Sequence, residues 1–157
     1  MIKTILIGLG SVGLAYKSNN HKSARYKIIR NHLEALQSTT GYKITGLVEK
    51  DHKKKLFLKK DLSNLFHSNL SSLSNNKIDL AVVACSTESH YNILKSLIRL
   101  RVPYILVEKP ITSNLRQALT IEKLIKKYKT KIFINFNRRY DPIFLKIKEK
   151  YKEKPKL

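Results

Sequence analysis

Three glycines near the start of the chain have the spacing of a turn that binds phosphate. Gly8, Gly10 and Gly13 form the pattern G-x-G-x-x-G directly after an apolar run. In such a turn the first glycine permits a tight bend, the second lets the backbone approach a pyrophosphate, and the third lets a helix pack on the sheet. We therefore expect a helix from Ser11 and Val12 onward, with its N–H groups and positive dipole end directed at the phosphates.

A carboxylate, Glu49, follows the second predicted strand, residues 42–48. An acidic residue at this place usually accepts hydrogen bonds from the adenosine ribose. Glu49 stands farther beyond Gly13 than the roughly 20 residues that the motif rule expects, and an insertion around residues 17–26 would account for the difference. The alternative interpretation is that Glu49 is an ordinary solvent-exposed charge in a loop.

The remaining candidates for chemistry also lie at the ends of predicted strands. They are Ser86, Thr87 and His90 after residues 78–84, Glu108, Lys109 and Pro110 after residues 103–107, and residues 135–139 at the end of the last strand. Because the carboxyl ends of parallel strands share one edge of an open sheet, where ligands bind, these side chains are expected to meet. Two alternatives stay open: His90 caps or packs the first turn of its helix, and Lys109 is an ordinary surface lysine.

The elements that position these residues alternate between strands and helices. Strands are predicted at residues 2–7, 42–48, near 65, 78–84, 103–107 and 131–136, with helical segments between them and a last helix after residue 141. This alternation is typical of parallel sheets with right-handed crossovers. The sequence therefore predicts an α/β fold: a Rossmann-type doubly wound parallel sheet with helices on both faces, in a single domain that spans residues 1–157.

The apolar spacing also predicts which helix residues face the core and which residues cap the helices. The expected inward residues are Leu56 and Phe57 in a helix over 52–59, Leu115, Ala118, Ile121, Leu124 and Ile125 in the next-to-last helix, and Ile143, Phe144, Ile147 and Tyr151 in the last. The expected caps are Ser86 or Thr87, one of residues 112–114, and Asp141, which precedes Pro142.

Composition bounds the class of protein. The 157 residues carry 32 Lys+Arg and 11 Asp+Glu, a formal net charge of +21. Such an excess is found in nucleic-acid-binding proteins, but here the lysines are spread along the chain and are not interleaved with aromatic residues as a single-strand-binding surface needs. The one cysteine, Cys85, allows no intrachain disulfide, and no apolar run reaches the roughly 20 residues of a membrane span. We expect a cytoplasmic protein with no membrane partner, and a nucleic-acid partner is disfavoured.

At this point the sequence resembles a known family. The segments ILIGLGSVG, GLVEKD, DLAVVACSTESHYNIL, ILVEKPIT and INFNRRYDPIF resemble the N-terminal domain of the glucose–fructose oxidoreductase and inositol dehydrogenase family (Gfo/Idh/MocA). The glycine turn is common to many families. The tripeptide Glu-Lys-Pro at 108–110, together with the preceding segment HYNIL, is much more specific.

The resemblance implies a role for each candidate residue and no metal site. Gly8, Gly10 and Gly13, with Ser11 and Val12, would hold the pyrophosphate, and Glu49 the adenosine ribose. Cys85, Ser86, Thr87 and His90 would line the nicotinamide side, Glu108, Lys109 and Pro110 would lie by the nicotinamide, and Arg139 would stand at the crossing toward a substrate domain. Lys109 is the implied catalytic residue, near the reacting carbon, and Pro110 is often preceded by a cis peptide in the family.

The implied reaction is hydride transfer between a nicotinamide and a sugar or cyclitol hydroxyl. The cofactor is NAD or NADP. Glu49 would repel the extra phosphate of NADP, whereas the cations Lys50, His52, Lys53, Lys54 and Lys55 would attract it, and on balance NAD is expected.

The family's second, substrate-binding domain is absent from the 157 residues. The expectation is therefore the truncated, nucleotide-binding half of an oxidoreductase, and whether this half is active alone is left open. One alternative is a non-catalytic dinucleotide-binding or interaction module. A basic nucleic-acid-binding domain is the less favoured one.

Overall fold

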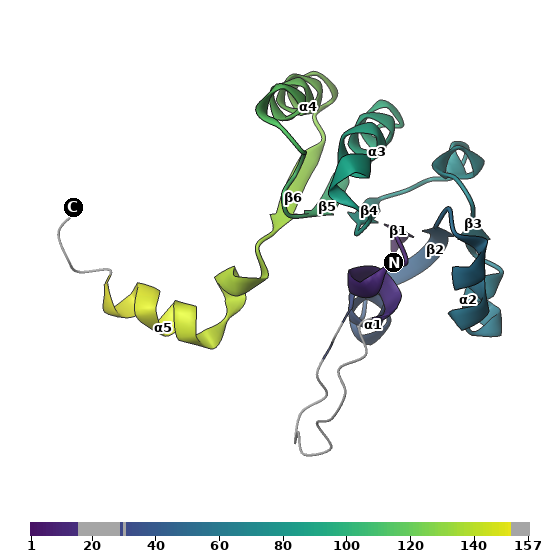
Figure 1. Ribbon diagram of the computed structural model, residues 1–157, viewed down its shortest axis with the longest axis horizontal. Coiled ribbons are helices and arrows are strands. Elements are labelled where there is room, and N and C mark those ends of the chain that lie inside the picture. Colours follow the sequence, from purple (N-terminus) through teal and green to yellow (C-terminus); the bar gives the residue numbers. More distant parts are fainter. Residues whose placement is uncertain (16–28, 30, 152–157) are drawn as a thin grey trace, which may run out of the picture.

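The protein is described from a computed structural model, which covers residues 1–15, 29 and 31–151. Its centre is one sheet of parallel strands (Figure 1). The strands are β1 (Ile2–Ile7), β2 (Tyr42–Val48), β3 (Phe66–His67), β4 (Leu80–Val83), β5 (Tyr104–Glu108) and β6 (Lys131–Asn135). Their order is β3-β2-β1-β4-β5-β6. The chain thus winds outward from β1 in both directions, which confirms the predicted doubly wound α/β fold.

Helices cover both faces of this sheet. Figure 1 shows α3 and α4 on one side of the strands and α1 on the other. The longer helices are α1 (His32–Ser38), α3 (Thr87–Arg99), α4 (Leu115–Tyr128) and α5 (Pro142–Lys150). The short helical segments are η1 (Ser11–Ala15), η2 (His52–Phe57), α2 (Lys60–Ser63), η3 (Leu70–Leu73) and η4 (Asn137–Tyr140). The predicted insertion around residues 17–26 lies outside the described residues.

Alternate residues of the central strands supply two separate cores. On β1, Ile5 and Ile7 face the α3–α4 side, where they pack with Leu97 and Ile121. Leu6 faces the other side, in the core that includes Leu33 of α1 and Leu62 of α2. Burial on both faces explains why the strand sequence reads as a nearly continuous apolar run.

Side chains cap two of the three helices for which the sequence predicts a cap. Asn114 accepts a hydrogen bond from the N–H of Gln117 at 3.0 Å, and Asp141 accepts one from the N–H of Ile143 at 2.9 Å, with Pro142 at the first helical position. Ser86 is the N-cap residue of α3 but makes no capping hydrogen bond with its side chain.

Three predictions about buried helix residues were wrong. Leu56 and Phe57 are 84% and 75% exposed, because residues 52–57 form a 3₁₀ helix and the apolar contacts of this segment come from Leu58 and Leu62 instead. Leu115 is 73% exposed, since it is the first residue of α4, whose one fully buried side chain is Ile121, near the middle.

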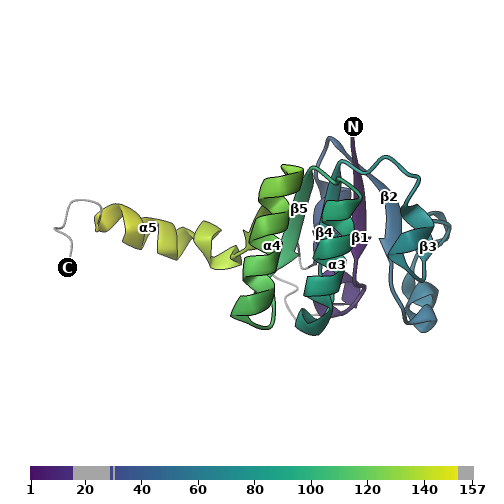
Figure 2. The same ribbon diagram turned by 90° about the horizontal axis from the view of Figure 1, so that it is seen from above.

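The predicted stripe of the last helix is also exposed. Ile143, Phe144, Ile147 and Tyr151 are between 45% and 67% exposed. Figures 1 and 2 show the reason: α5 projects away from the sheet and its layers, and its main contact among the described elements is with the neighbouring η4. None of the described helices is both long and apolar enough to span a membrane.

Candidate functional site

A cleft of about 710 Å³ opens where the central strands end. Its walls come from the glycine turn after β1, the residues after β2 and β3, and the start of α3. Seven sequence-predicted site residues line it: Gly8, Gly10, Ser11, Val12, Glu49, Cys85 and Ser86. Sequence reasoning missed five polar side chains that line the same cleft: Ser68, Asn69, Glu88, Ser89 and Asn92. Ser68 and Asn69 directly follow β3, and their position at the end of a strand was the sequence feature that could have identified them.

Two of the motif glycines are required by the fold itself. Gly8 has φ +93°, and a Cβ there would lie 2.5 Å from the backbone N of Cys85. A Cβ on Gly13 would overlap the carbonyl oxygen of Gly8. The turn therefore needs glycine at both positions simply to fold against the end of β4.

Gly10 differs, because a Cβ at this position would meet nothing closer than the Lys54 ammonium at 3.9 Å. The fold alone would thus accept a side chain at residue 10, which faces the cleft. The missing side chain leaves room for a ligand to approach the backbone, as the pyrophosphate of a dinucleotide requires. After Gly10 the chain enters a π-helical turn, Ser11–Ala15, where the sequence predicts the start of a helix.

Glu49 faces the glycine turn from the end of β2. Its Oε2 accepts a hydrogen bond from the N–H of Leu9 at 2.8 Å and lies 3.4 Å from the Lys54 Nζ, and its Oε1 accepts one from the N–H of Asp51 at 3.1 Å. Burial raises the pKa of Glu49, but these N–H groups and the ammonium outweigh burial and hold the pKa below its ordinary value. The side chain is therefore a fixed anion at neutral pH.

The Glu-Lys-Pro segment ends β5 outside this cleft. Glu108 is mostly buried, and its Oε1 accepts a hydrogen bond from the Asn135 amide at 2.6 Å and lies 2.8 Å from His32 Nε2. Lys109 and Pro110 are exposed and joined by a cis peptide bond. His32, which comes from α1, is a partner of Glu108 that sequence reasoning missed, since nothing in local spacing relates two residues so far apart.

His90 joins the two loops beneath the cleft. Its side chain is 1% exposed, with Nδ1 2.9 Å from the carbonyl oxygen of Pro110 and Nε2 3.1 Å from that of Cys85. Because Gly8 lies against the backbone of Cys85, a continuous series of contacts links the glycine turn to the Glu-Lys-Pro segment. Both segments therefore lie at the same edge of the sheet, and His90 packs in the first turn of α3.

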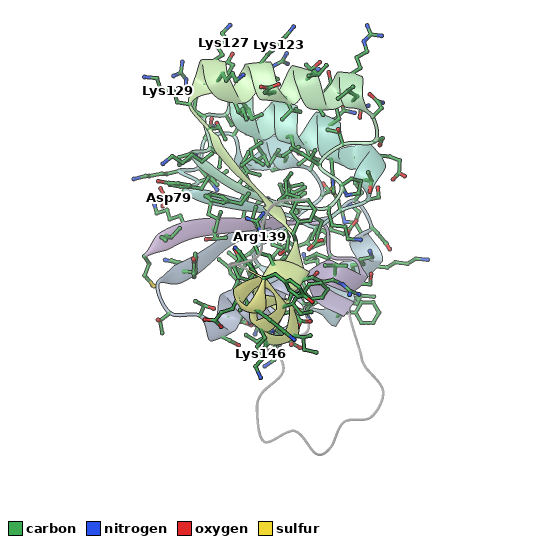
Figure 3. All side chains as sticks on the ribbon, turned by 90° about the vertical axis from the view of Figure 1, so that its left-hand side faces the viewer. Asp79, Lys123, Lys127, Lys129, Arg139 and Lys146 are labelled. Atoms are coloured by element: carbon green, nitrogen blue, oxygen red, sulfur yellow. The ribbon has the colours of Figure 1, made fainter. Side chains whose placement is uncertain are left out.

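The other predicted site residues are placed as follows. Thr87 begins α3 and is half-buried. Arg139 is exposed on η4, and Figure 3 shows it where the chain passes from β6 toward α5. Burial raises the pKa of the Cys85 thiol, which keeps it protonated and a poor nucleophile at neutral pH. Within the described ranges no three His, Cys, Asp or Glu side chains group as metal ligands.

Comparisons with known proteins match this arrangement. A family model described as "Oxidoreductase family, NAD-binding Rossmann fold" (Gfo/Idh/MocA) covers residues 2–136. Among curated proteins, the putative oxidoreductase YceM of Salmonella typhimurium is 28% identical over 116 residues, which make up 74% of this chain and 37% of that protein.

Solved structures share the fold. The dehydrogenase MviM from Clostridium difficile has a TM-score of 0.74 at 28% identity, over 94% of this chain and 43% of its own. The WlbA dehydrogenase from Chromobacterium violaceum, in complex with NADH and UDP-GlcNAcA, has a TM-score of 0.79 at 16% identity, over 97% of this chain and 40% of its own. The chain thus spans about two fifths of the length of these relatives. Since the family match extends from β1 to the end of β6, the chain belongs to the Gfo/Idh/MocA family of oxidoreductases, and residues 2–136 are its NAD-binding Rossmann-fold domain.

Proposed function

We propose that the cleft binds a nicotinamide dinucleotide, and that the chain is the cofactor-binding part of an oxidoreductase acting on a sugar or cyclitol hydroxyl. One observation carries this proposal: Gly10 has free space toward the cleft, and the Glu49 carboxylate lines the same cleft. A pyrophosphate needs the first feature and a ribose diol the second. The residues of the cleft therefore fit the cofactor that the family implies.

Each end of the site has a proposed task. The turn from Gly8 to Gly13, with Ser11 and Val12, would hold the pyrophosphate, and Glu49 would accept hydrogen bonds from the adenosine ribose. Cys85, Ser86, Thr87 and His90 are proposed to build the nicotinamide side. The bound nicotinamide supplies hydride transfer.

Lys109 is the proposed catalytic residue, because it is the exposed central residue of the Glu-Lys-Pro turn that follows β5. From there it would orient the substrate hydroxyl or take part in moving its proton. Glu108 and Pro110 hold that turn, and Arg139 would face the substrate-binding part.

Glu49 also favours NAD(H) over NADP(H), because its fixed negative charge opposes a phosphate on the neighbouring ribose. NADH is therefore the first ligand to test. A cytoplasmic location completes the proposal, on the ground that the sequence has a single cysteine and hence no disulfide.

Catalysis needs more than these residues. The relatives are more than twice as long as the matched region, and we propose that substrate binding belongs to a further domain outside the 157 residues. The exposed apolar side chains of α5 favour a second possibility, an interaction module that binds the dinucleotide without turnover. Turnover of any polyol by the purified chain with NAD⁺, followed as NADH absorbance, would exclude this second possibility.

The proposed function predicts saturable NADH binding that Gly10→Asp abolishes. An aspartate at residue 10 fits the free protein but would place a carboxylate where the pyrophosphate binds, so the NADH affinity should fall at least about 100-fold. Nicotinamide fluorescence measures the binding, and circular dichroism checks the fold.

Asn75→Asp is the matched control, since it adds the same charge at an exposed residue before the amino-terminal end of β4 and should leave NADH binding unchanged. Gly10→Ala tests size without charge. Saturable binding of equal strength in wild type and Gly10→Asp would rule the proposal out.

A further inference from the structure

Lys54 occupies a distinctive place among the many lysines of this chain. It lines the cleft, its Nζ is 3.4 Å from the Oε2 of Glu49, and the same ammonium is the nearest atom to the open side of Gly10. Its side chain is 31% exposed, whereas that of Glu49 is 14% exposed. The cation thus lies between the carboxylate proposed to bind the ribose and the turn proposed to bind the phosphates.

The backbone holds Lys54 in this place. The Asp51 carboxylate accepts a hydrogen bond from the N–H of Lys53 at 3.0 Å, and the Asp51 carbonyl accepts one from the N–H of Lys54 at 3.1 Å. Asp51 in turn donates its own N–H to Glu49. These bonds fold residues 49–54 into a compact turn, so the Lys54 side chain lies close to the Glu49 carboxylate.

This placement bears on the choice between the two dinucleotides. A ribose bound to Glu49 would carry its 2′-oxygen close to that carboxylate, and a phosphate on this oxygen would meet a negative charge. Lys54 offsets the charge at the same point and offers an ammonium to the phosphate oxygens. Lys50 also lines the cleft, whereas Lys53 and Lys55 do not.

We propose that Lys54 is a specificity-determining residue that lets the cleft accept a ribose 2′-phosphate, so that NADPH binds within about threefold of NADH. The proposal rests on the proposed function. In the free protein Lys54 pairs with Glu49. When NADPH binds, the ammonium turns to the 2′-phosphate while Glu49 keeps its bonds to the N–H groups of Leu9 and Asp51.

The test measures the dissociation constants of NADH and NADPH for wild type and Lys54→Gln at one ionic strength. The variant should bind NADPH about tenfold more weakly and NADH within about twofold of wild type, because only NADPH carries the 2′-phosphate. Lys54→Met, which keeps the aliphatic stem, should behave in the same way and guards against an effect of lost packing.

Lys53→Gln is the matched control. It removes the same charge from the adjacent residue of the same turn, but Lys53 is exposed and lies outside the cleft, so the ratio of the two dissociation constants should stay at its wild-type value. Glu49→Gln should strengthen NADPH binding relative to NADH, since it removes the opposing charge.

The outcomes separate this inference from the proposed function. If wild type binds NADH but not NADPH, or if Lys54→Gln weakens both dinucleotides equally, Lys54 does not recognise the 2′-phosphate and the inference is wrong while the function stands. The inference is equally wrong if Lys53→Gln changes the ratio as much as Lys54→Gln does. If neither dinucleotide binds to wild type, the proposed function and the inference both fail.

Discussion

Glu49 receives hydrogen bonds or charge from three groups that approach it from different directions. The N–H of Leu9 comes from the glycine turn, and the N–H of Asp51 and the ammonium of Lys54 come from the segment that follows β2. The carboxylate therefore ties two loops together before any ligand arrives. A group that structural hydrogen bonds hold as an anion is already charged for the proposed contact with a ribose, and its depressed pKa links its ionisation to folding.

This linkage predicts how stability depends on pH. Because the pKa of Glu49 is lowered in the folded state, its contribution is complete above the unfolded pKa and is lost as the pH falls through the folded pKa, on the acid side of the ordinary glutamate pKa. Glu49→Gln should have a lower Tm than wild type at pH 7, and the difference should shrink as the solution is made more acidic. Scanning calorimetry at a series of pH values measures both curves.

The exposed Asp61 supplies the control carboxylate. For Asp61→Asn we expect a Tm curve parallel to that of wild type. A Glu49→Gln curve that also runs parallel would show that the ionisation of Glu49 is not coupled to folding.

At the scale of the elements, the site depends on how neighbouring strand ends are joined. β4 and β5 are adjacent in the sheet. The loops that follow them carry the carbonyl groups of Cys85 and Pro110, and the hydrogen bonds between the two strands do not fix the distance between these loops. His90 on α3 spans this gap with one imidazole. Each ring nitrogen lies within hydrogen-bond distance of one carbonyl oxygen, and an N–H on either nitrogen can donate to the carbonyl that it faces.

His90→Leu should therefore destabilise the fold without creating a large cavity. Leucine has a similar volume but offers no donor, and leaving a buried carbonyl unpaired costs about 1–3 kcal/mol. Urea unfolding followed by circular dichroism measures the loss. The exposed His52 provides the control, since His52→Leu should change the unfolding free energy by less than about 0.5 kcal/mol. A His90→Leu protein as stable as wild type would mean that the histidine is not structurally required.

The whole molecule divides into a covered body and an uncovered extension. The sheet and its flanking helices form the body, and η4 with α5 extends from it (Figure 2). Large apolar side chains are exposed on and near this extension: Phe133, Phe136, Tyr140, Ile143, Phe144, Leu145, Ile147 and Tyr151. Figure 3 shows Lys123 and Lys127 on the α4 side of the molecule and Lys146 on the α5 side. Exposed apolar side chains gathered on one extension are typical of a surface that contacts another protein.

The purified 157-residue chain should accordingly associate through α5. The double variant Phe144→Ser/Ile147→Ser should shift the chain toward monomer in sedimentation velocity and lower its binding of a hydrophobic dye. The stability of the body should change by less than about 1 kcal/mol, because both side chains are exposed. Leu56→Ser, at an exposed apolar residue of η2, is the control and should leave association unchanged. Undiminished association of the double variant would show that α5 is not the surface responsible.

The amino-acid sequence by itself determined the order of strands and helices, the parallel sheet, and the edge at which Gly10, Glu49 and Lys109 stand. These features follow from the periodicity of apolar residues and from the spacing of the glycines, and both are properties of residues close together in the sequence. Only the tertiary structure decided that Lys54 returns over Glu49, that His32 reaches Glu108, and that the apolar residues of α5 and η2 face outward. Apolar periodicity predicts which side of a helix is apolar. Whether that side is buried depends on contacts between segments far apart in the chain.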